Sequence, residues 1–215
     1  MKNYLAEFIG TALLLAIVAG SGYMGETLGA GNAAVALLGN SIATGAGLYV
    51  LITLLGPVSG AHFNPVVSLM SWKLGQLDLK KMLGYWACQF SGAIAGIWLT
   101  HLLFSLPILQ ESTKVRTGLG IWASEFVSTL ILLAAIRIGD QVAKDKLPML
   151  VALTVTAGYW FTSSTFFSNP AVALARGFTN TFVGIAPSDV PGFVIAEVIA
   201  VLVMVGWFCR SKQSN

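Results

Sequence analysis

Two Asn-Pro pairs are the residues of this sequence whose type and spacing could do chemistry. Asn64-Pro65 lies in "SGAHFNPVVSL" and Asn169-Pro170 lies in "FFSNPAVALAR". Asparagine is a good N-cap and proline is tolerated at the first helical position, so each pair predicts the start of a helix. The asparagine amide is also a hydrogen-bond donor that could bind the oxygen of a small solute.

The composition defines the surroundings of these pairs. Hydrophobic residues make up 56% of the 215 residues and charged residues only 10%, with a mean hydropathy of +0.79. Several apolar runs, with at most one glutamate each, are long enough to cross a bilayer, which needs about 20 residues. We therefore predict an all-α membrane protein with spans at residues 4–24, 33–61, 82–110, 118–136, 147–175 and 191–209.

The lysines and arginines predict the orientation of these spans. With six spans both termini lie on one side, and that side receives nine of the 12 basic residues. By the positive-inside rule both termini are cytoplasmic, in a plasma or inner membrane. The nine are Lys2, Lys73, Lys80, Lys81, Arg137, Lys144, Lys146, Arg210 and Lys212. The net charge of +3 therefore reflects topology, and nothing supports a nucleic-acid partner.

The two halves of the chain resemble each other. "AEFIGTALLL" at residues 6–15 aligns with "SEFVSTLILL" at residues 124–133, and each half carries one Asn-Pro pair after its second span. Each half has three spans, an odd number, so the second half is inverted relative to the first. We expect a single channel domain, 1–215, built from repeats at about 1–110 and about 118–215. The functional site of such inverted repeats lies near the membrane midplane.

The stretches that begin at the Asn-Pro pairs, 64–72 and 169–178, are too short to cross a bilayer. They predict two re-entrant half-helices, one from each face, whose N-termini meet at the centre. The non-helical backbone before each pair needs a water-filled cavity at membrane depth. Both N-termini carry partial positive charge, which would oppose the passage of cations.

Taken with the small-Glu-Phe starts of spans one and four, these paired motifs resemble those of the aquaporin, or major intrinsic protein, family. The resemblance covers essentially the whole chain. It implies six transmembrane helices and two re-entrant half-helices around one pore per chain, assembled as a homotetramer in the lipid bilayer. It places the pore centre at Asn64, Pro65, Val66, Asn169, Pro170 and Ala171.

The resemblance also places a four-residue selectivity filter, which is counted from the two asparagines as Thr44, Ala157, Phe166 and Val172. Family members nearly always carry arginine where Val172 stands. The small side chains and the absent arginine indicate a wide, apolar constriction. Arg176 lies one helical turn beyond Val172. It could point into the vestibule and partly replace the arginine, or bind a neighbouring carbonyl or a lipid phosphate.

Other polar and small residues suggest roles around the pore. Glu7 and Glu125 lie at matching positions of the two halves and are expected to accept hydrogen bonds from the backbone of the re-entrant loops. His62 could line the inner pore, and His101 is expected to be a lone interfacial residue. A Gly-x-x-x-Gly pair at residues 92 and 96 predicts close helix packing.

We therefore predict a passive channel for small neutral solutes, wider than a strict water channel: arsenite or other metalloid hydroxides, glycerol-like polyols, and water. A strict water channel and a coupled secondary transporter are the alternatives. A coupled transporter would be expected to carry a charged residue near the midplane for its coupling ion. No enzyme, cofactor or metal site is predicted, because the sequence offers neither an activated nucleophile nor a cluster of metal ligands.

Overall fold

The computed structural model describes residues 1–211, and this part of the chain consists of helices and loops. Six long helices and two short ones follow the predicted order, so the predicted fold class is confirmed. The long helices are α1 (Lys2–Leu28), α2 (Ala33–Ser59), α4 (Leu79–Leu103), α5 (Leu119–Val142), α6 (Leu147–Phe161) and α8 (Val190–Ser211). The short helices are α3 (Pro65–Lys73) and α7 (Pro170–Arg176), and single 3₁₀ turns, η1 (Lys144–Lys146) and η2 (Pro187–Asp189), precede α6 and α8.

Capping residues explain where several helices begin and end. The side chain of Asn32 accepts hydrogen bonds from the first turn of α2, and Asp78 does the same for α4. Gly60 ends α2 in the left-handed conformation, which glycine adopts without steric cost. The fifth predicted span differs from the structure, because α6 ends at Phe161 and residues 162–169 form a loop before α7.

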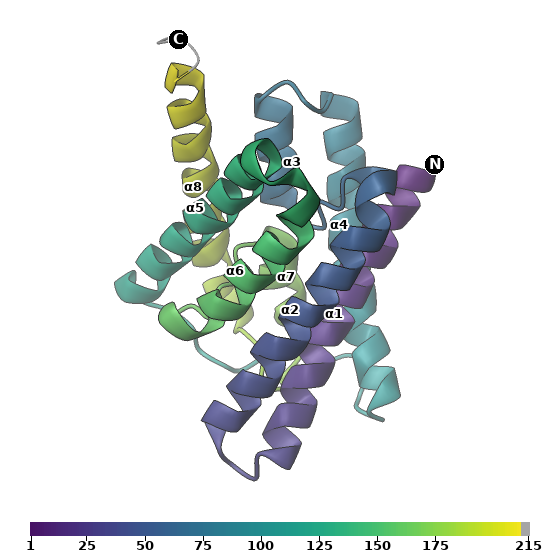
Figure 1. The fold of residues 1–215 in the computed structure, drawn as a ribbon. Coiled ribbons are helices and arrows are strands. Elements are labelled where there is room, and N and C mark those ends of the chain that lie inside the picture. Colours follow the sequence, from purple (N-terminus) through teal and green to yellow (C-terminus); the bar gives the residue numbers. More distant parts are fainter. Residues whose placement is uncertain (212–215) are drawn as a thin grey trace.

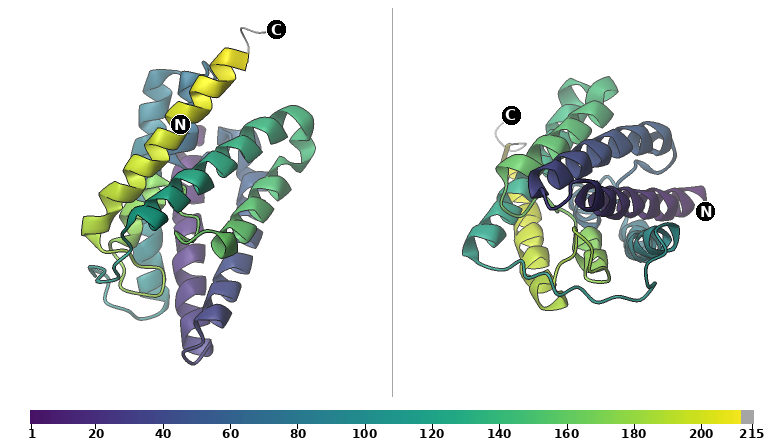
Figure 2. Two further views of the ribbon diagram at one scale, coloured as in Figure 1. Left: turned by 90° about the vertical axis from the view of Figure 1, so that its left-hand side faces the viewer. Right: turned by 90° about the horizontal axis from the view of Figure 1, so that it is seen from below.

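The two ends of the molecule are distinct. The N-terminus and the C-terminal end of α8 lie at one end, which we call the terminal end (Figure 1). The loops at residues 104–118 and 177–189 lie together at the opposite end, which we call the loop end. The turn between α1 and α2 and the turn between α5 and α6 point to opposite ends (Figure 2). Lys212, one of the residues that predicted the orientation, lies outside the described part of the chain.

The helices pack as a bundle around the two short helices. α1 packs against α2 and α4, α2 packs against α6, and α5 packs against α6 and α8. Both α3 and α7 contact α4 and α8. The predicted close packing at Gly92 and Gly96 is confirmed, because a Cβ atom at either position would collide with the backbone of α1.

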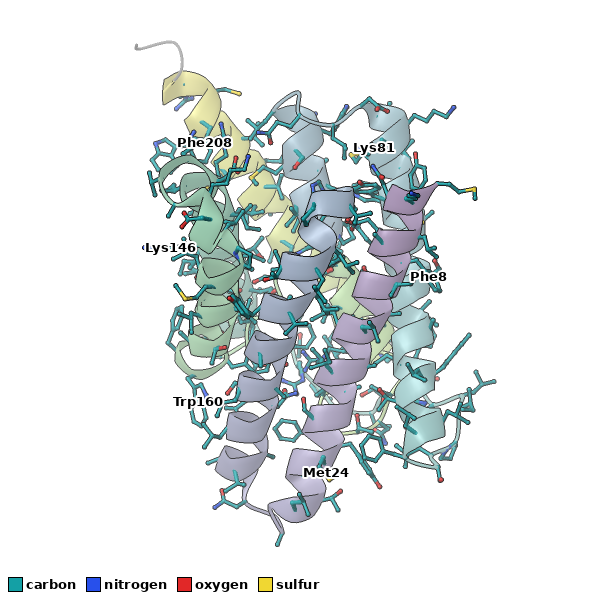
Figure 3. All side chains as sticks on the ribbon, turned by 45° about the vertical axis from the view of Figure 1, so that its right-hand side comes forward. Phe8, Met24, Lys81, Lys146, Trp160 and Phe208 are labelled. Carbon is teal, nitrogen blue, oxygen red and sulfur yellow. The ribbon has the colours of Figure 1, made fainter. Side chains whose placement is uncertain are left out.

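The polarity of the bundle is that of a membrane protein. Large apolar side chains are exposed on its outside, among them Leu102 and Leu153, whereas the carboxyl groups of Glu7, Glu125 and Glu197 are fully buried. Figure 3 shows the side chains around the bundle, with Trp160 on the outer side of α6 and Lys81 near the terminal end. By length and composition, α1, α2, α5 and the segment 187–210 could each cross a membrane. The protein is therefore a multi-pass membrane protein.

Candidate functional site

The N-termini of α3 and α7 meet at the centre of the bundle and are joined through their capping asparagines. The Oδ1 of Asn64 accepts a hydrogen bond from the first turn of α3, and that of Asn169 does the same in α7. The Nδ2 of Asn64 donates to the carbonyl of Ser168 (2.6 Å), and the Nδ2 of Asn169 donates to the carbonyl of Phe63 (2.8 Å). Each amide has two N–H groups. One N–H of each asparagine therefore remains for another acceptor.

The backbone before each asparagine repeats one unusual conformation. In both loops the third and the first residue before the asparagine are left-handed: Ala61 and Phe63, with φ of 48° each, and Phe166 and Ser168, with φ of 56° and 48°. For residues other than glycine this conformation costs about 1–3 kcal/mol each. The strained residues include Phe63 and Ser168, whose carbonyls bind the opposite asparagine.

A buried carboxylate holds the first loop. One oxygen of Glu7 accepts hydrogen bonds from the N–H of His62 (3.0 Å) and the hydroxyl of Ser59 (2.6 Å). The other oxygen accepts from the N–H of Phe63 (2.7 Å) and the side-chain amide of Gln89 (2.8 Å). These bonds tie the strained backbone to α1 and α4, so Glu7 compensates part of its conformational cost.

Two carboxyl groups hold the second loop. Glu125 accepts hydrogen bonds from the N–H groups of Phe167 (3.3 Å) and Ser168. Glu197 accepts from the N–H of Asn169 (2.8 Å). The two carboxyl groups also face each other, and Oε2 of Glu197 is buried without a hydrogen-bond partner among the described residues.

Glu197→Gln is expected to raise the thermal stability of the protein by about 1 kcal/mol, the scale of one net hydrogen bond. The amide oxygen can still accept from Asn169, while the amide nitrogen can donate to Glu125, as Gln89 donates to Glu7 in the first half. The substitution also supplies a permanent donor where two neighbouring carboxyl groups must otherwise share one proton. Thermal unfolding in detergent measures the change.

Glu125→Gln is the control for this stability measurement. It replaces an acceptor of two backbone N–H groups by a side chain with one oxygen, so it should lower the midpoint of unfolding. A midpoint of Glu197→Gln at or below that of the wild-type protein would contradict the proposed hydrogen bond to Glu125.

An elongated cavity of about 240 Å³ passes both asparagines. Its lining runs from Thr44 and Arg176 toward the loop end to Gln76, Arg137 and Asp140 at the terminal end. Many lining residues recur every four positions, about one helical turn. These rows are Thr44, Leu48 and Ile52 in α2, Leu132, Ile136 and Asp140 in α5, Leu147, Val151, Val155 and Tyr159 in α6, and Val172 and Arg176 in α7.

Three of the four predicted filter residues line this cavity, namely Thr44, Phe166 and Val172. The prediction for Ala157 is wrong, because its side chain is exposed on the outer face of α6. Tyr159 lines the cavity instead, and its hydroxyl lies 3.2 Å from the Oγ1 of Thr44. Two positions along a helix are about 200° apart. A count along the chain from Asn169 that misses by two residues therefore selects the opposite face.

Tyr159 was missed in the sequence, although a signal for it is present. Leu147, Val151, Val155 and Tyr159 form a row with a spacing of four, and Ala157 lies off that row. The spacing between α6 and the second asparagine is set by the loop at residues 162–169, whose length no helical period reveals.

His62 and Arg176 both line the cavity. The Nδ1 of His62 lies 2.9 Å from the Oγ of Ser68. The Nε of Arg176 donates to the carbonyl of Val183, and its guanidinium carbon lies 3.5 Å from the ring centre of Phe167. Arg176 therefore binds a neighbouring carbonyl and also borders the cavity, which combines two of the alternatives left open by the sequence.

His101 does not match its prediction as a lone interfacial residue. Its ring is fully buried between the carbonyl of Ile108 (2.8 Å from Nδ1) and the hydroxyl of Thr179 (2.9 Å from Nε2). The ring thereby ties α4 to the loop that follows α7.

The sequence and the fold are both similar to those of known channel proteins. The chain is 53% identical to aquaglyceroporin AqpS of Rhizobium meliloti, over 99% of this chain and 92% of that protein. It is 29% identical to the glycerol uptake facilitator protein of Haemophilus influenzae, over 93% and 88% of the two chains. The aquaglyceroporin structure from Plasmodium falciparum has the same fold, with a TM-score of 0.71 at 21% identity, covering 100% of this chain and 99% of that one. The sequence model of the major intrinsic protein family matches residues 1–200, and the chain belongs to this family.

Proposed function

We propose that the protein is a passive transmembrane channel for small neutral solutes, including glycerol and water. The observation that carries this proposal is the cavity that passes the amides of Asn64 and Asn169 between the N-termini of two half-helices. The two free N–H groups can replace the hydrogen bonds that a hydroxyl-bearing solute loses in water. The names of the relatives, an aquaglyceroporin and a glycerol uptake facilitator, support the same solute class.

The electrostatics of the cavity favour neutral solutes. Each half-helix N-terminus carries a partial positive charge of up to about half an elementary charge. Among the described residues that line the cavity, the one acidic side chain is Asp140, which lies at the terminal end and faces Arg137 and Lys144. The carboxyl groups near the centre accept hydrogen bonds from loop backbone instead. This arrangement supports a passive channel over an ion-coupled transporter.

We propose that the residues flanking the asparagines form the pore centre and that the filter lies toward the loop end. The pore centre consists of Asn64, Pro65, Val66, Asn169, Pro170 and Ala171, and the filter of Thr44, Tyr159, Phe166 and Val172. Valine in the place of the family's arginine leaves room for solutes wider than water, so arsenite and other metalloid hydroxides are included in the proposed class. Glu7 and Glu125 act as structural residues.

The organisation of the chain in the membrane is part of the proposal. The two halves, at about 1–110 and about 118–215, are inverted repeats of a single domain. Both termini are cytoplasmic in a plasma or inner membrane, and the chains assemble as a homotetramer. The exposed apolar side chains of the outer surface support burial against lipid and neighbouring copies.

Stopped-flow light scattering on proteoliposomes tests the proposal. Vesicles with the protein should shrink and reswell faster than empty vesicles in glycerol and in arsenite, and the solute flux should rise linearly with concentration. Dissipating ion gradients should leave the flux unchanged. Water flux without solute flux would indicate a strict water channel, and saturable, gradient-dependent flux would indicate a coupled transporter.

Tyr159→Phe is expected to lower glycerol permeability about threefold or more, the scale of one net hydrogen bond. The substitution removes the hydroxyl that faces Thr44 while keeping the ring in the lining. Thr44→Val should have a similar effect, and the double variant should lose little more than either single variant if the two hydroxyls act as a pair. Rates of glycerol-driven reswelling measure the change.

The outer face of α6 provides the matched control for Tyr159. Ala157→Leu adds a larger side chain on the exposed face and should leave glycerol permeability unchanged. A strong loss of glycerol permeability in Ala157→Leu, with no loss in Tyr159→Phe, would show that Ala157 and not Tyr159 belongs to the filter.

A further inference from the structure

Arg176 differs from the other basic residues near the cavity because it is buried and has no carboxylate partner. Its exposed fraction is 3%. The ion pairs of the described residues involve Lys114, Arg137 and Lys144, and none involves Arg176. Among the described residues, the side chain of Arg176 makes one hydrogen bond, from Nε to the carbonyl of Val183. Neither Nη nitrogen of Arg176 has an acceptor among these residues.

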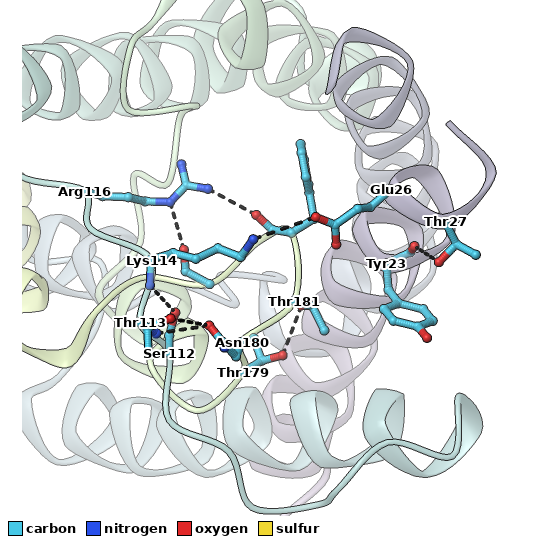
Figure 4. Close-up of polar contacts among 12 residues, drawn as sticks. Tyr23, Glu26, Thr27, Ser112, Thr113, Lys114, Arg116, Thr179, Asn180 and Thr181 are labelled. Atoms are coloured by element: carbon cyan, nitrogen blue, oxygen red, sulfur yellow. Dashed lines mark hydrogen bonds and ion pairs between the residues drawn. The ribbon is translucent and has the colours of Figure 1, made fainter. Parts of the chain in front are cut away.

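The guanidinium group of Arg176 is fixed in place. Its central carbon lies 3.5 Å from the ring centre of Phe167, and its Nε is held by the carbonyl of Val183. The segment that carries Val183 is itself held by Arg116, whose side chain donates to the carbonyls of Gly184 (2.8 Å) and Phe182 (3.3 Å), as Figure 4 shows. Arg116 does not line the cavity, so its part is to position this segment.

An unpaired buried charge is costly unless water or a ligand satisfies its hydrogen-bonding groups. Because Arg176 lines the cavity, its Nη groups can donate to molecules inside it. One helical turn, about 5.4 Å, separates Arg176 from Val172 along α7. The charge therefore lies beyond the apolar constriction, toward the loop end, and leaves the width at Val172 unchanged.

We infer that Arg176 forms a solute-binding site at the loop-end entrance of the cavity. Its Nη groups bind hydroxyl oxygens of small polyols and undissociated oxyacids, and its charge repels cations. The inference deepens the proposed function, on which it rests. It assigns binding and charge exclusion to Arg176 and solute width to Val172, which are two different positions of α7. If Arg176 served only to anchor Val183, its charge and its Nη donors would have no effect on permeation.

Three variants in proteoliposomes separate these roles. Arg176→Gln removes the charge and should raise potassium permeability at least about tenfold, because a unit charge a few ångströms from the ion path repels a cation strongly in a low-dielectric surrounding. Arg176→Lys keeps the positive charge but loses the two Nη donor groups of the planar guanidinium. Potassium exclusion should therefore persist, while glycerol permeability falls about threefold or more. Lys114→Gln is the charge-matched control, since Lys114 lies at the same end, pairs with Glu26 (3.8 Å) and lies off the cavity lining.

Moving the positive charge to another position of α7 shows whether a potassium leak in Arg176→Gln comes from the lost charge or from lost packing of the loop. Val172→Arg in the Arg176→Gln background restores a guanidinium inside the cavity without restoring the bond to Val183. Potassium exclusion should return in this double variant but not in Val172→Leu combined with Arg176→Gln, which fills the opening without adding charge. A leak caused by a collapsed loop would persist, and that outcome would overturn the inference.

The remaining outcomes also decide the inference. Potassium permeability of Arg176→Gln equal to that of Lys114→Gln overturns it, as does unchanged glycerol permeability in Arg176→Lys. If Arg176→Gln does not assemble, Arg176→Lys alone carries the test of solute binding through the same glycerol measurement. Failure of the proposed function has a different signature, because wild-type vesicles would then show no glycerol flux at all.

Discussion

Asn169→Asp is expected to convert the cation barrier at the centre of the cavity into an attraction, with potassium permeability rising at least about tenfold. An aspartate keeps an oxygen that accepts from Ala171 and Val172, and a negative charge is favourable at a helix N-terminus. The donor to the carbonyl of Phe63 is lost, which leaves two acceptors facing each other. Glycerol permeability should therefore fall while potassium flux increases. Potassium uptake and glycerol reswelling of the same vesicles measure both effects.

Asn169→Ala is the matched control for this charge effect. It removes the cap and the amide donor without adding charge, so it should destabilise the protein by about 1 kcal/mol and leave potassium exclusion intact. Asn64→Asp should behave as Asn169→Asp does, because its amide makes the equivalent bond to Ser168. Equal potassium permeability in the aspartate and alanine variants would show that the asparagines do not border the ion path.

The order and type of the helices could be predicted because each depends on local sequence. Apolar runs of about 20 residues or more are long enough to predict spanning helices. The Asn-Pro pairs mark the start of α3 and α7 to the residue, because both members of each pair favour the first turn. The helix ends are less local. α6 ends at Phe161 within an uncharged run, and the loop that follows is fixed by contacts with Glu125, far away in the sequence.

The candidate site could be predicted where its residues lie close to a motif. Phe166 and Val172 are within three residues of Asn169 and line the cavity, whereas Ala157 was counted across a loop and faces outward. The cross-bonds between the asparagines and the opposite carbonyls link residues more than 100 positions apart. They depend on left-handed backbone at alanine, phenylalanine and serine, which do not favour that conformation.

Arg176 and Arg137 illustrate the limit for charged residues. In the sequence each is a single basic residue near the end of an apolar run, which is typical of a residue at the membrane surface. In the structure both line the cavity, one toward each end. Arg176 belongs to the row of α7 that faces the cavity, and Arg137 follows Ile136, a member of the corresponding row of α5. The direction in which a charged side chain points is set by the packing of the whole bundle, and composition does not reveal it.

Val172→Arg is expected to lower glycerol permeability by at least about tenfold while water permeability falls much less. Val172 faces the cavity beside Phe166 and Thr44, so a longer side chain there fills the opening that a polyol needs. The new guanidinium would also lie one turn from Arg176, and like charges at this spacing repel. Both effects act on the constriction, whereas a single file of water molecules requires a smaller opening.

The ratio of glycerol to water permeability, measured in the same vesicles, tests this expectation independently of protein amount. Val172→Leu is the matched control, because it adds volume without charge or hydrogen-bond donors. If volume alone restricts the pore, Val172→Leu should lower the ratio in the same direction and less strongly than Val172→Arg. If the ratio is unchanged in Val172→Arg, position 172 does not set solute width. The narrowest point would then lie beside Tyr159 and Thr44, whose hydroxyls hydrogen-bond each other in the cavity lining.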